Sequence, residues 1–404
     1  MSVKSFRYAR LCAGFGLAAA NLGWPLIAAA ADAGNAFNPK ISLILDGNFA
    51  RYTRDEKVAP VPGFVLGDDA AFIPSGLSLG ETELAVESNV DDIFHAWATI
   101  SLKPEGNVSV EEAYINTISL PDGFVVKFGR FFSDIGYQNH LHAHAWDFVD
   151  APLVYRAFLG NQYGDDGLQL RWIAPLPVFL EFGGELLRGD AFPGGGDNRK
   201  GIPGKTVFVH LGDDLNASWS YRLGLSYLHT TASDRRTDEN GATSFSGRSN
   251  LGIFDFVAKW APSGNPTQHN AIIQGEYFRR SERGVVVADP DGAAPSSNYD
   301  GTQSGFYLQA AYQFIPQWRV GVRYDHVHAA NTLDNPAPGT SLETLADDTH
   351  DPQRWSTMID WSHSEFSRVR LQFSRDESRP NREADNQVFV QYIFSLGSHP
   401  AHSF

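Results

Sequence analysis

Three histidines alternate in the segment His-Leu-His-Ala-His, and two aspartates follow shortly after it. The histidines are His140, His142 and His144, and the aspartates are Asp147 and Asp150. In an extended chain alternate side chains point to one side, so the three imidazoles would face one ion together. Imidazole nitrogen and carboxylate oxygen are ligands that suit Zn²⁺. The spacing predicts a metal site of His140, His142, His144 and Asp147; the alternative is that these histidines hydrogen-bond to polar neighbours.

A second set of residues could govern the passage of charged solutes. The positions predicted to line a pore are Glu81, Glu83, Glu87, Glu112, Lys127, Glu181, Glu185, Arg222, Arg280, Arg319, Arg323, Arg368 and Arg370. Acidic members come mostly early in the chain and basic members late. In a closed barrel they would lie on opposing walls and set a field across the lumen. The alternative is that charges at wet positions pair locally.

Catalytic patterns are weak. Ser362, His363 and Ser364 suggest a hydrolase, but alternation beside a turn is the commoner explanation. Glu111 and Glu112 resemble a carboxylate pair, yet neighbouring residues on a strand point to opposite faces and would not share a substrate. The sequence has no glycine-rich phosphate loop, His-Glu-x-x-His helix or serine elbow. We therefore predict that the protein is not an enzyme.

Strands must position all of these residues. Residues 304–314 and 317–328 alternate apolar with polar side chains, which is the pattern of strands with one dry and one wet face. Such runs reach about ten residues, the length that a tilted strand needs to cross a bilayer. The pattern predicts an all-β fold, a transmembrane antiparallel β-barrel with a wet lumen.

The predicted barrel has about 16 strands. They are expected at 41–51, 77–89, 93–102, 109–120, 124–131, 167–174, 178–188, 205–212, 217–229, 250–260, 270–280, 304–314, 317–328, 353–362, 367–376 and 386–396. Tight turns alternate with long loops, as in bacterial barrels. The long loops are expected at 53–75, 132–166, 189–204, 231–249, 282–303 and 330–352. We expect 132–166 to fold into the lumen and narrow it, because a loop of this length amid tight hairpins is commonly functional.

Composition agrees with a barrel that has a wet interior. The mean hydropathy is −0.27, yet aromatic residues make up 13% of the chain and glycine is abundant. Only alternate residues of a barrel strand face lipid, so a membrane barrel can have low mean hydropathy. The net charge of −15 argues against nucleic acid as a partner.

The N-terminal segment has the features of an export signal. Lys4, Arg7 and Arg10 precede an apolar run, and small residues gather at Ala28 to Ala31. We predict a signal peptide at 1–31 and a single barrel domain at 32–404. No cysteine follows Cys12, which suits passage through an oxidising periplasm.

Two stretches resemble known outer-membrane proteins. Residues 127–153 read K-F-G-R-F-F-S-D-I-G-Y-Q-N-H-L-H-A-H-A-W-D-F-V-D-A-P-L and resemble the strand and lumen-folded loop of phosphate-selective porins of the O and P type. Where those porins carry a ladder of arginine and lysine, this segment carries histidines and carboxylates. The chain end resembles the last strand of outer-membrane proteins, with Phe404 as the terminal aromatic residue. The histidine-rich loop and a tail with His399 and His402 are similar to proteobacterial zinc-regulated outer-membrane receptors.

These resemblances imply an outer-membrane channel, surrounded by lipid, for passive diffusion of small hydrophilic solutes or ions. A homotrimer is common among similar porins. The alternative function is a zinc-linked metal-binding receptor or transport barrel, with divalent cations as its partners. It would lack a plug domain, because only about ten residues separate the predicted cleavage site from Ile41. We predict no resident cofactor. If the alternative function holds, the protein would bind zinc.

Overall fold

The structure is a computed structural model. It describes residues 39–54, 60–67, 70–102, 106–196, 202–236, 243–346, 350–380 and 382–397. The predicted signal peptide at 1–31 lies outside the described residues, as do the tail residues His399, His402 and Phe404.

Most of the described chain is extended. The strands are β1 (Lys40–Tyr52), β2 (Gly76–Leu79), β3 (Thr82–Asn89), β4 (Phe94–Leu102), β5 (Val108–Thr117), β6 (Phe124–Phe132), β7 (Gly164–Ile173), β8 (Phe179–Leu187), β9 (Gly195–Gly196), β10 (Gly204–Asn216), β11 (Trp219–Arg236), β12 (Thr243–Trp260), β13 (Asn270–Ala288), β14 (Ser296–Ile315), β15 (Trp318–Leu333), β16 (Gln353–Ser364), β17 (Ser367–Asp376) and β18 (Asp385–Gly397). The helices are η2 (Pro121–Gly123), η3 (Ala143–Ala145), α1 (Leu153–Leu159), α2 (Ser341–Ala346) and η4 (Pro262–Gly264). Within the described ranges, no helix is both long and apolar enough to span a membrane.

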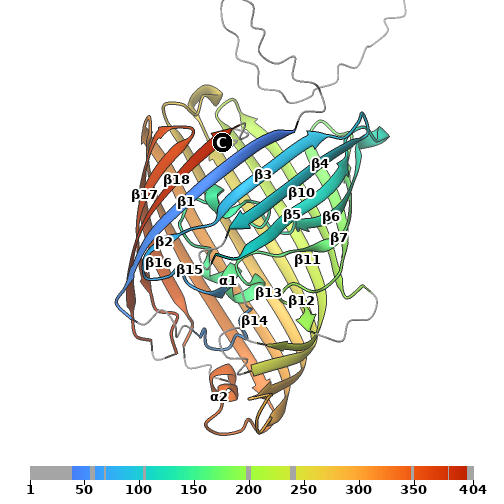
Figure 1. Cartoon of the computed structure of the whole chain (residues 1–404), viewed down its shortest axis with the longest axis vertical. Coiled ribbons are helices and arrows are strands. Elements are labelled where there is room, and N and C mark those ends of the chain that lie inside the picture. The colour runs from blue at the N-terminus through green and yellow to red at the C-terminus, as the bar shows by residue number, and fades with distance from the viewer. Residues whose placement is uncertain are drawn as a thin grey trace, which may run out of the picture.

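The strands close into one antiparallel barrel (Figure 1). β18 pairs with β1 from Ser42↔Gly397 onward, so the first and last strands meet at the same rim. β2 and β3 both pair with β1 and together make one wall strand, interrupted at Gly80 and Glu81. The two-residue β9 pairs parallel to β11 and is not a wall strand. Of the eighteen strands in the described residues, sixteen wall strands therefore remain, which confirms the predicted fold class.

Alternation along the wall strands separates an apolar outer face from a polar inner face. On β14, Leu308 is 48% exposed on the outside, whereas the neighbouring Gln309 is 3% exposed. On β15, Val322 is exposed and Arg323 is buried in the same way. The alternation predicted for 304–314 and 317–328 is thus confirmed. Exposed apolar side chains on a closed barrel are what a lipid-facing surface requires.

Aromatic side chains gather at two levels of this outer face. Near the tight turns, Trp318 packs against Trp361 with ring centroids 6.4 Å apart. Farther along the same strands, Tyr324 packs against Trp355 at 4.5 Å. Both Trp355 and Trp361 face outward. Two aromatic levels bordering an apolar band are typical of membrane barrels.

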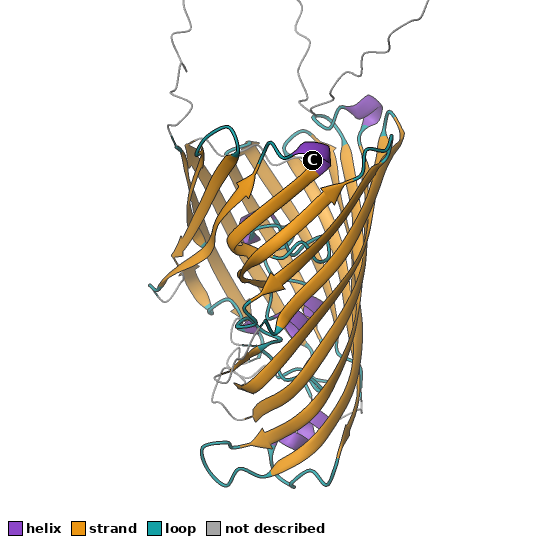
Figure 2. Cartoon of the chain, turned by 90° about the vertical axis from the view of Figure 1, so that its right-hand side faces the viewer, coloured by secondary structure: helices purple, strands orange, loops and turns teal. Residues whose placement is uncertain are grey.

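The wall is much taller on one side than on the other (Figure 2). β11 to β14 have 18 to 20 residues each, whereas β3 to β8 have 8 to 10. The predicted loops 231–249, 282–303 and 330–352 were therefore too long, because much of each continues the strand ladder. Most outward residues in these extensions are polar, as in the Arg283–Asp300 ion pair, and Val285 is an exposed apolar exception. The alternation of apolar and polar residues ends where the extensions begin. The strand ends predicted from that alternation therefore came too early in the chain.

The interior is not uniformly polar, which corrects the expectation of a wet lumen. We call residues 133–163, between β6 and β7, the inner loop. Its helix α1 packs against β13, β14 and β15 inside the barrel (Figure 1). Leu153, Phe158 and Leu159 are fully buried with Phe278 of β13 and Phe64 of the 60–67 segment. The apolar residues of the inner loop thus find partners on the wall, and their burial favours the docked loop.

Candidate functional site

The structure places the thirteen predicted pore-lining residues toward the lumen. Twelve lie on inward positions of wall strands, and Glu81 lies at the interruption between β2 and β3. Glutamates from β3, β5 and β8 make an acidic wall of Glu83, Glu111, Glu112, Glu181 and Glu185. Arginines from β15, β16 and β17 make an arginine wall of Arg319, Arg323, Arg354, Arg368 and Arg370.

The inner loop lies between these two walls and contacts both. Asp150 binds the arginine wall, with its carboxylate 2.8 Å from Arg323 and 2.7 Å from Arg354. Asp147 lies 2.9 Å from Arg319. Burial opposes ionisation of Asp150, but Arg354 and Arg323 outweigh it and lower the pKa of Asp150 to about 2. Asp150 is therefore a carboxylate at every ordinary pH.

Backbone groups of the inner loop strengthen this contact. The guanidinium of Arg370 donates to the carbonyl of Trp146 at 2.8 Å, and that of Arg354 donates to the carbonyl of Ala151 at 2.7 Å. Arg368 donates to the carbonyl of His144. Hydrogen bonds from charged donors are among the stronger ones in proteins. The arginine wall therefore holds the loop by its backbone as well as by its aspartates.

The wall also supplies a carboxylate that accepts hydrogen bonds from the inner loop. Glu276 of β13 accepts hydrogen bonds from the Gln138 amide at 2.9 Å and from the Tyr155 hydroxyl. It also accepts from Tyr307 on β14 at 2.8 Å. Gly136 has a φ of 70°, and a Cβ there would lie 2.3 Å from Glu276 Oε2, so only glycine fits this approach. The loop partners of Glu276 lie about 140 residues away in the chain, so the sequence pattern could not show that it binds the loop.

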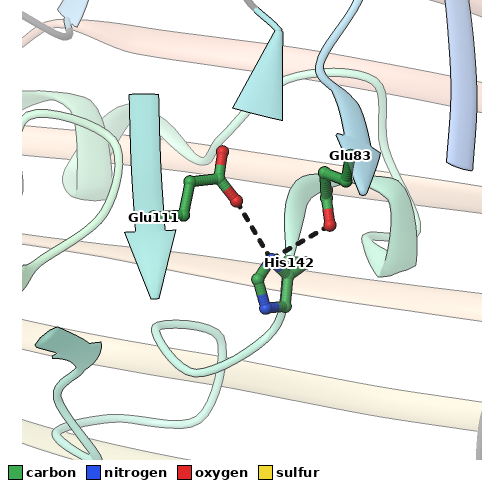
Figure 3. A group of neighbouring side chains, drawn as sticks. All are labelled: Glu83, Glu111 and His142. Atoms are coloured by element: carbon green, nitrogen blue, oxygen red, sulfur yellow. Dashed lines mark hydrogen bonds and ion pairs between the residues drawn. The ribbon is translucent and has the colours of Figure 1, made fainter. Parts of the chain in front are cut away.

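His142 of the inner loop faces the acidic wall (Figure 3). His142 Nδ1 lies 3.2 Å from Glu111 and 3.3 Å from Glu83, and its Nε2 lies 3.0 Å from Glu112. His144 Nδ1 lies 2.8 Å from Glu83. Burial disfavours the imidazolium of His142, but Glu83, Glu111 and Glu112 outweigh this and raise its pKa well above the usual value. The site has a strongly negative potential.

The contact of Glu111 with His142 corrects the expectation that Glu111 and Glu112 face apart. Thr99 pairs with Glu112 and Ile100 pairs with Val110, so Glu111 is the extra residue of a β-bulge. A bulge interrupts the alternation of side chains and re-aims one of them. Both carboxylates therefore reach the same imidazole. The adjacent glutamates were visible in the sequence. That both face the lumen depends on the β-bulge, which the alternation of residue types cannot reveal.

The four residues predicted as one metal site do not come together. His142 and His144 stack with ring centroids 5.7 Å apart. His140 is exposed and packs edge-on against Tyr137, and Asp147 binds Arg319 on the opposite wall. Among the described residues, the group that brings three ligand atoms within 4.8 Å of one another is Glu83, Glu111 and His142. The short helix η3, which contains His144, breaks the extended conformation that the prediction assumed.

A cavity of about 950 Å³ adjoins the inner loop. It lies between the loop, β1, β5 and the 190–196 segment, and Glu81 and Glu111 line it. Seven carboxylates and four arginines are among its described lining residues. The acidic wall is therefore accessible from an aqueous space.

Solved proteins of the same shape are outer-membrane barrels. OmpT with a deletion of loop L8, an outer membrane protein of Vibrio cholerae, has a TM-score of 0.54 and 11% identity, covering 89% of this chain and 100% of that one. An anion-selective porin from Comamonas acidovorans has a TM-score of 0.54 and 10% identity, covering 89% and 99%. The outer membrane channel DcaP of Acinetobacter baumannii has a TM-score of 0.52 and 12% identity, covering 89% and 96%. The fold is that of a porin-type barrel.

Sequence relatives define the family more narrowly. The chain is 31% identical over 395 residues to an uncharacterized protein of Aquifex aeolicus (strain VF5), covering 91% of this chain and 80% of that protein. It belongs to the same family as that protein. No described protein-family profile matches the chain.

Proposed function

We propose that this protein is an outer-membrane channel through which small hydrophilic solutes or ions diffuse. The observation that carries the proposal is the combination of an apolar outer belt with a charged inner wall around an aqueous cavity. The porin-type fold supports it. The inner loop restricts the passage, since it contacts the acidic wall, β13 and the arginine wall.

We propose cations and neutral solutes, rather than phosphate, as the preferred cargo. Carboxylates outnumber arginines in the cavity lining by seven to four. The arginine wall is paired with carboxylates, as Arg319 is with Asp360 and Asp147. The resemblance of 127–153 to phosphate-selective porins therefore does not extend to a ladder of cations facing solvent. A surplus of carboxylates raises the local concentration of cations.

Reconstitution tests this function. The mature chain, purified in detergent and added to planar lipid bilayers, should produce discrete conductance steps. In a KCl gradient the reversal potential should have the sign of a cation preference. Liposomes containing the protein should swell in small sugars and swell more slowly in larger ones.

The matched variant is Asp150→Asn, which removes the ion pairs of the inner loop with Arg323 and Arg354 and should therefore widen the passage. If neither the native chain nor this variant conducts ions or admits sugars while the barrel is folded, the channel function is wrong. Anion-selective current would contradict the proposed cargo but not the proposal that the protein is a channel.

A further inference from the structure

We propose that Glu83, Glu111 and His142 form a binding site for one borderline divalent cation of the Zn²⁺ class. The site joins β3, the bulge of β5 and the inner loop (Figure 3). The proposal rests on the geometry of these side chains and not on the channel function.

The distances match the edges of a coordination shell. Zinc bonds to nitrogen and carboxylate oxygen measure about 2.0–2.2 Å, so the ligands of a tetrahedral ion lie about 3.3–3.5 Å apart. His142 Nδ1 lies 3.2 Å from Glu111 Oε2 and 3.3 Å from Glu83 Oε2. An ion that replaced the proton on Nδ1 would meet both oxygens with little movement. Water from the cavity would complete the shell.

Two further contacts orient the ligands. With the metal on Nδ1, the Nε2–H of His142 donates to Glu112 at 3.0 Å. Metal-bound histidines commonly donate their second ring nitrogen to a carboxylate, which fixes the tautomer and the ring plane. His144 Nδ1 bonds the other oxygen of Glu83 at 2.8 Å and leaves Glu83 Oε2 for the ion. The fit of His142 with Glu112 is the arrangement expected of a second coordination shell.

Oxygen Oε1 of Glu111 receives no hydrogen bond from an N–H group. Its side chain is 9% exposed, and among the described residues no backbone, amide or guanidinium N–H donates to Oε1. The Glu81 carboxyl group shares a side-chain hydrogen bond with Glu111. Four glutamates, Glu81, Glu83, Glu111 and Glu112, thus surround two imidazoles. Several carboxylates buried together are costly, and a divalent cation that replaces the Nδ1 proton of His142 would add one net positive charge among them.

A cation can reach the site from solvent. Glu81 and Glu111 both line the cavity of about 950 Å³, together with Phe132 at the end of β6 and Ala143 of the inner loop. Mixed nitrogen and oxygen ligands suit Zn²⁺ and its first-row neighbours better than Mg²⁺ or Ca²⁺, which prefer oxygen alone. We therefore expect little competition from Mg²⁺.

Equilibrium binding of Zn²⁺ tests the site directly. Isothermal titration of the detergent-solubilised full chain should show one tight site per chain that is lost in Glu111→Gln and in His142→Ala. Glu112→Gln should weaken it about 10–100-fold, as removal of a second-shell partner does. Co²⁺ bound at this site should show the intense visible absorption of a four- or five-coordinate ion.

His140→Ala is the matched control, because His140 lies in the same loop but outside the cluster. It should bind Zn²⁺ as the native chain does. Heat-modifiable migration on gels reports whether each variant is folded. If His142→Ala does not fold, the result for the near-isosteric Glu111→Gln decides the test.

Three outcomes would overturn the proposal: no tight site in the native chain, equal binding in Glu111→Gln, or loss of binding in His140→Ala. The first would mean that His142 only anchors the loop as an imidazolium. Because binding is measured without current, its failure is distinct from a failure of the channel function.

Discussion

At the scale of single residues, opposite charges on the inner loop and the wall meet in matched pairs. His142 and His144 of the loop face glutamates, and its Asp147 and Asp150 face arginines. Asp150 joins two strands, since Arg323 belongs to β15 and Arg354 to β16. Both arginine side chains are 1% exposed, so loss of the Asp150 carboxylate would leave buried charges with fewer partners.

Asp150→Asn should loosen the inner loop without unfolding the barrel. Losing one partner of a buried ion pair costs about 3–5 kcal/mol, and here less, because Asp325 still pairs with both arginines. We expect larger and noisier single-channel conductance and a lower midpoint of thermal unfolding. Asp122→Asn, at an exposed turn, is the control and should change neither. An unchanged conductance in Asp150→Asn would show that this contact does not hold the loop.

The same residue predicts a pH dependence. In the docked loop the pKa of Asp150 is about 2, below its ordinary value of 3.8, so its stabilisation is fully present above about pH 4. It is lost as the pH falls through 3.8 toward 2. Single-channel conductance of the native chain should stay restricted from neutral pH to about pH 4 and rise below it. Asp150→Asn should lack this step, and a step that persists in Asp150→Asn would show that another group controls the loop.

At the scale of elements, the inner loop acts as a separate layer inside a finished barrel. Its helix α1 buries apolar side chains against β13, β14 and β15, while the wall keeps its own ladder of backbone hydrogen bonds. The loop can therefore change without disturbing strand pairing.

Deleting residues 138–152 should raise the single-channel conductance clearly. The deletion removes His142, His144, Asp147 and Asp150, and with them the contacts to both charged walls. Heat-modifiable migration should be retained, because no wall strand is shortened. A conductance equal to that of the native chain would place the restriction elsewhere, for example in the 60–67 segment.

At the scale of the whole molecule, lipid contact is confined to a band. Apolar side chains such as Val322 and Leu371 cover the outer face, while the extensions of β11 to β15 carry polar residues outward. The tall side of the wall therefore extends beyond the bilayer.

Leu371→Arg should destabilise the barrel by about 2–4 kcal/mol, because the arginine would enter the middle of the lipid band. Thr302→Arg, an outward position in the extension of β14, should cost no more than about 1 kcal/mol. Urea unfolding in lipid vesicles measures both. Equal losses of stability in the two variants would mean that the lipid-facing band does not coincide with the exposed apolar residues.

The sequence by itself determined the barrel and the inward positions of its charges. Alternation is a local property that each strand carries alone, so β14 and β15 could be read without knowing their partners. It did not determine which inward residues meet. That depends on strand register and on the inner loop crossing the lumen, which bring Asp150 to Arg354 and His142 to Glu112 across long stretches of chain.

Only the tertiary structure decided the composition of the candidate metal site. The sequence pattern grouped His140, His142, His144 and Asp147, but the loop is not extended there, and its charges are attracted to opposite walls. Glu111 entered the site through a bulge, which alternation cannot reveal. Local patterns fix which way a side chain faces when the strand is regular. Convergence of side chains from β3, β5 and the inner loop is a property of the closed barrel.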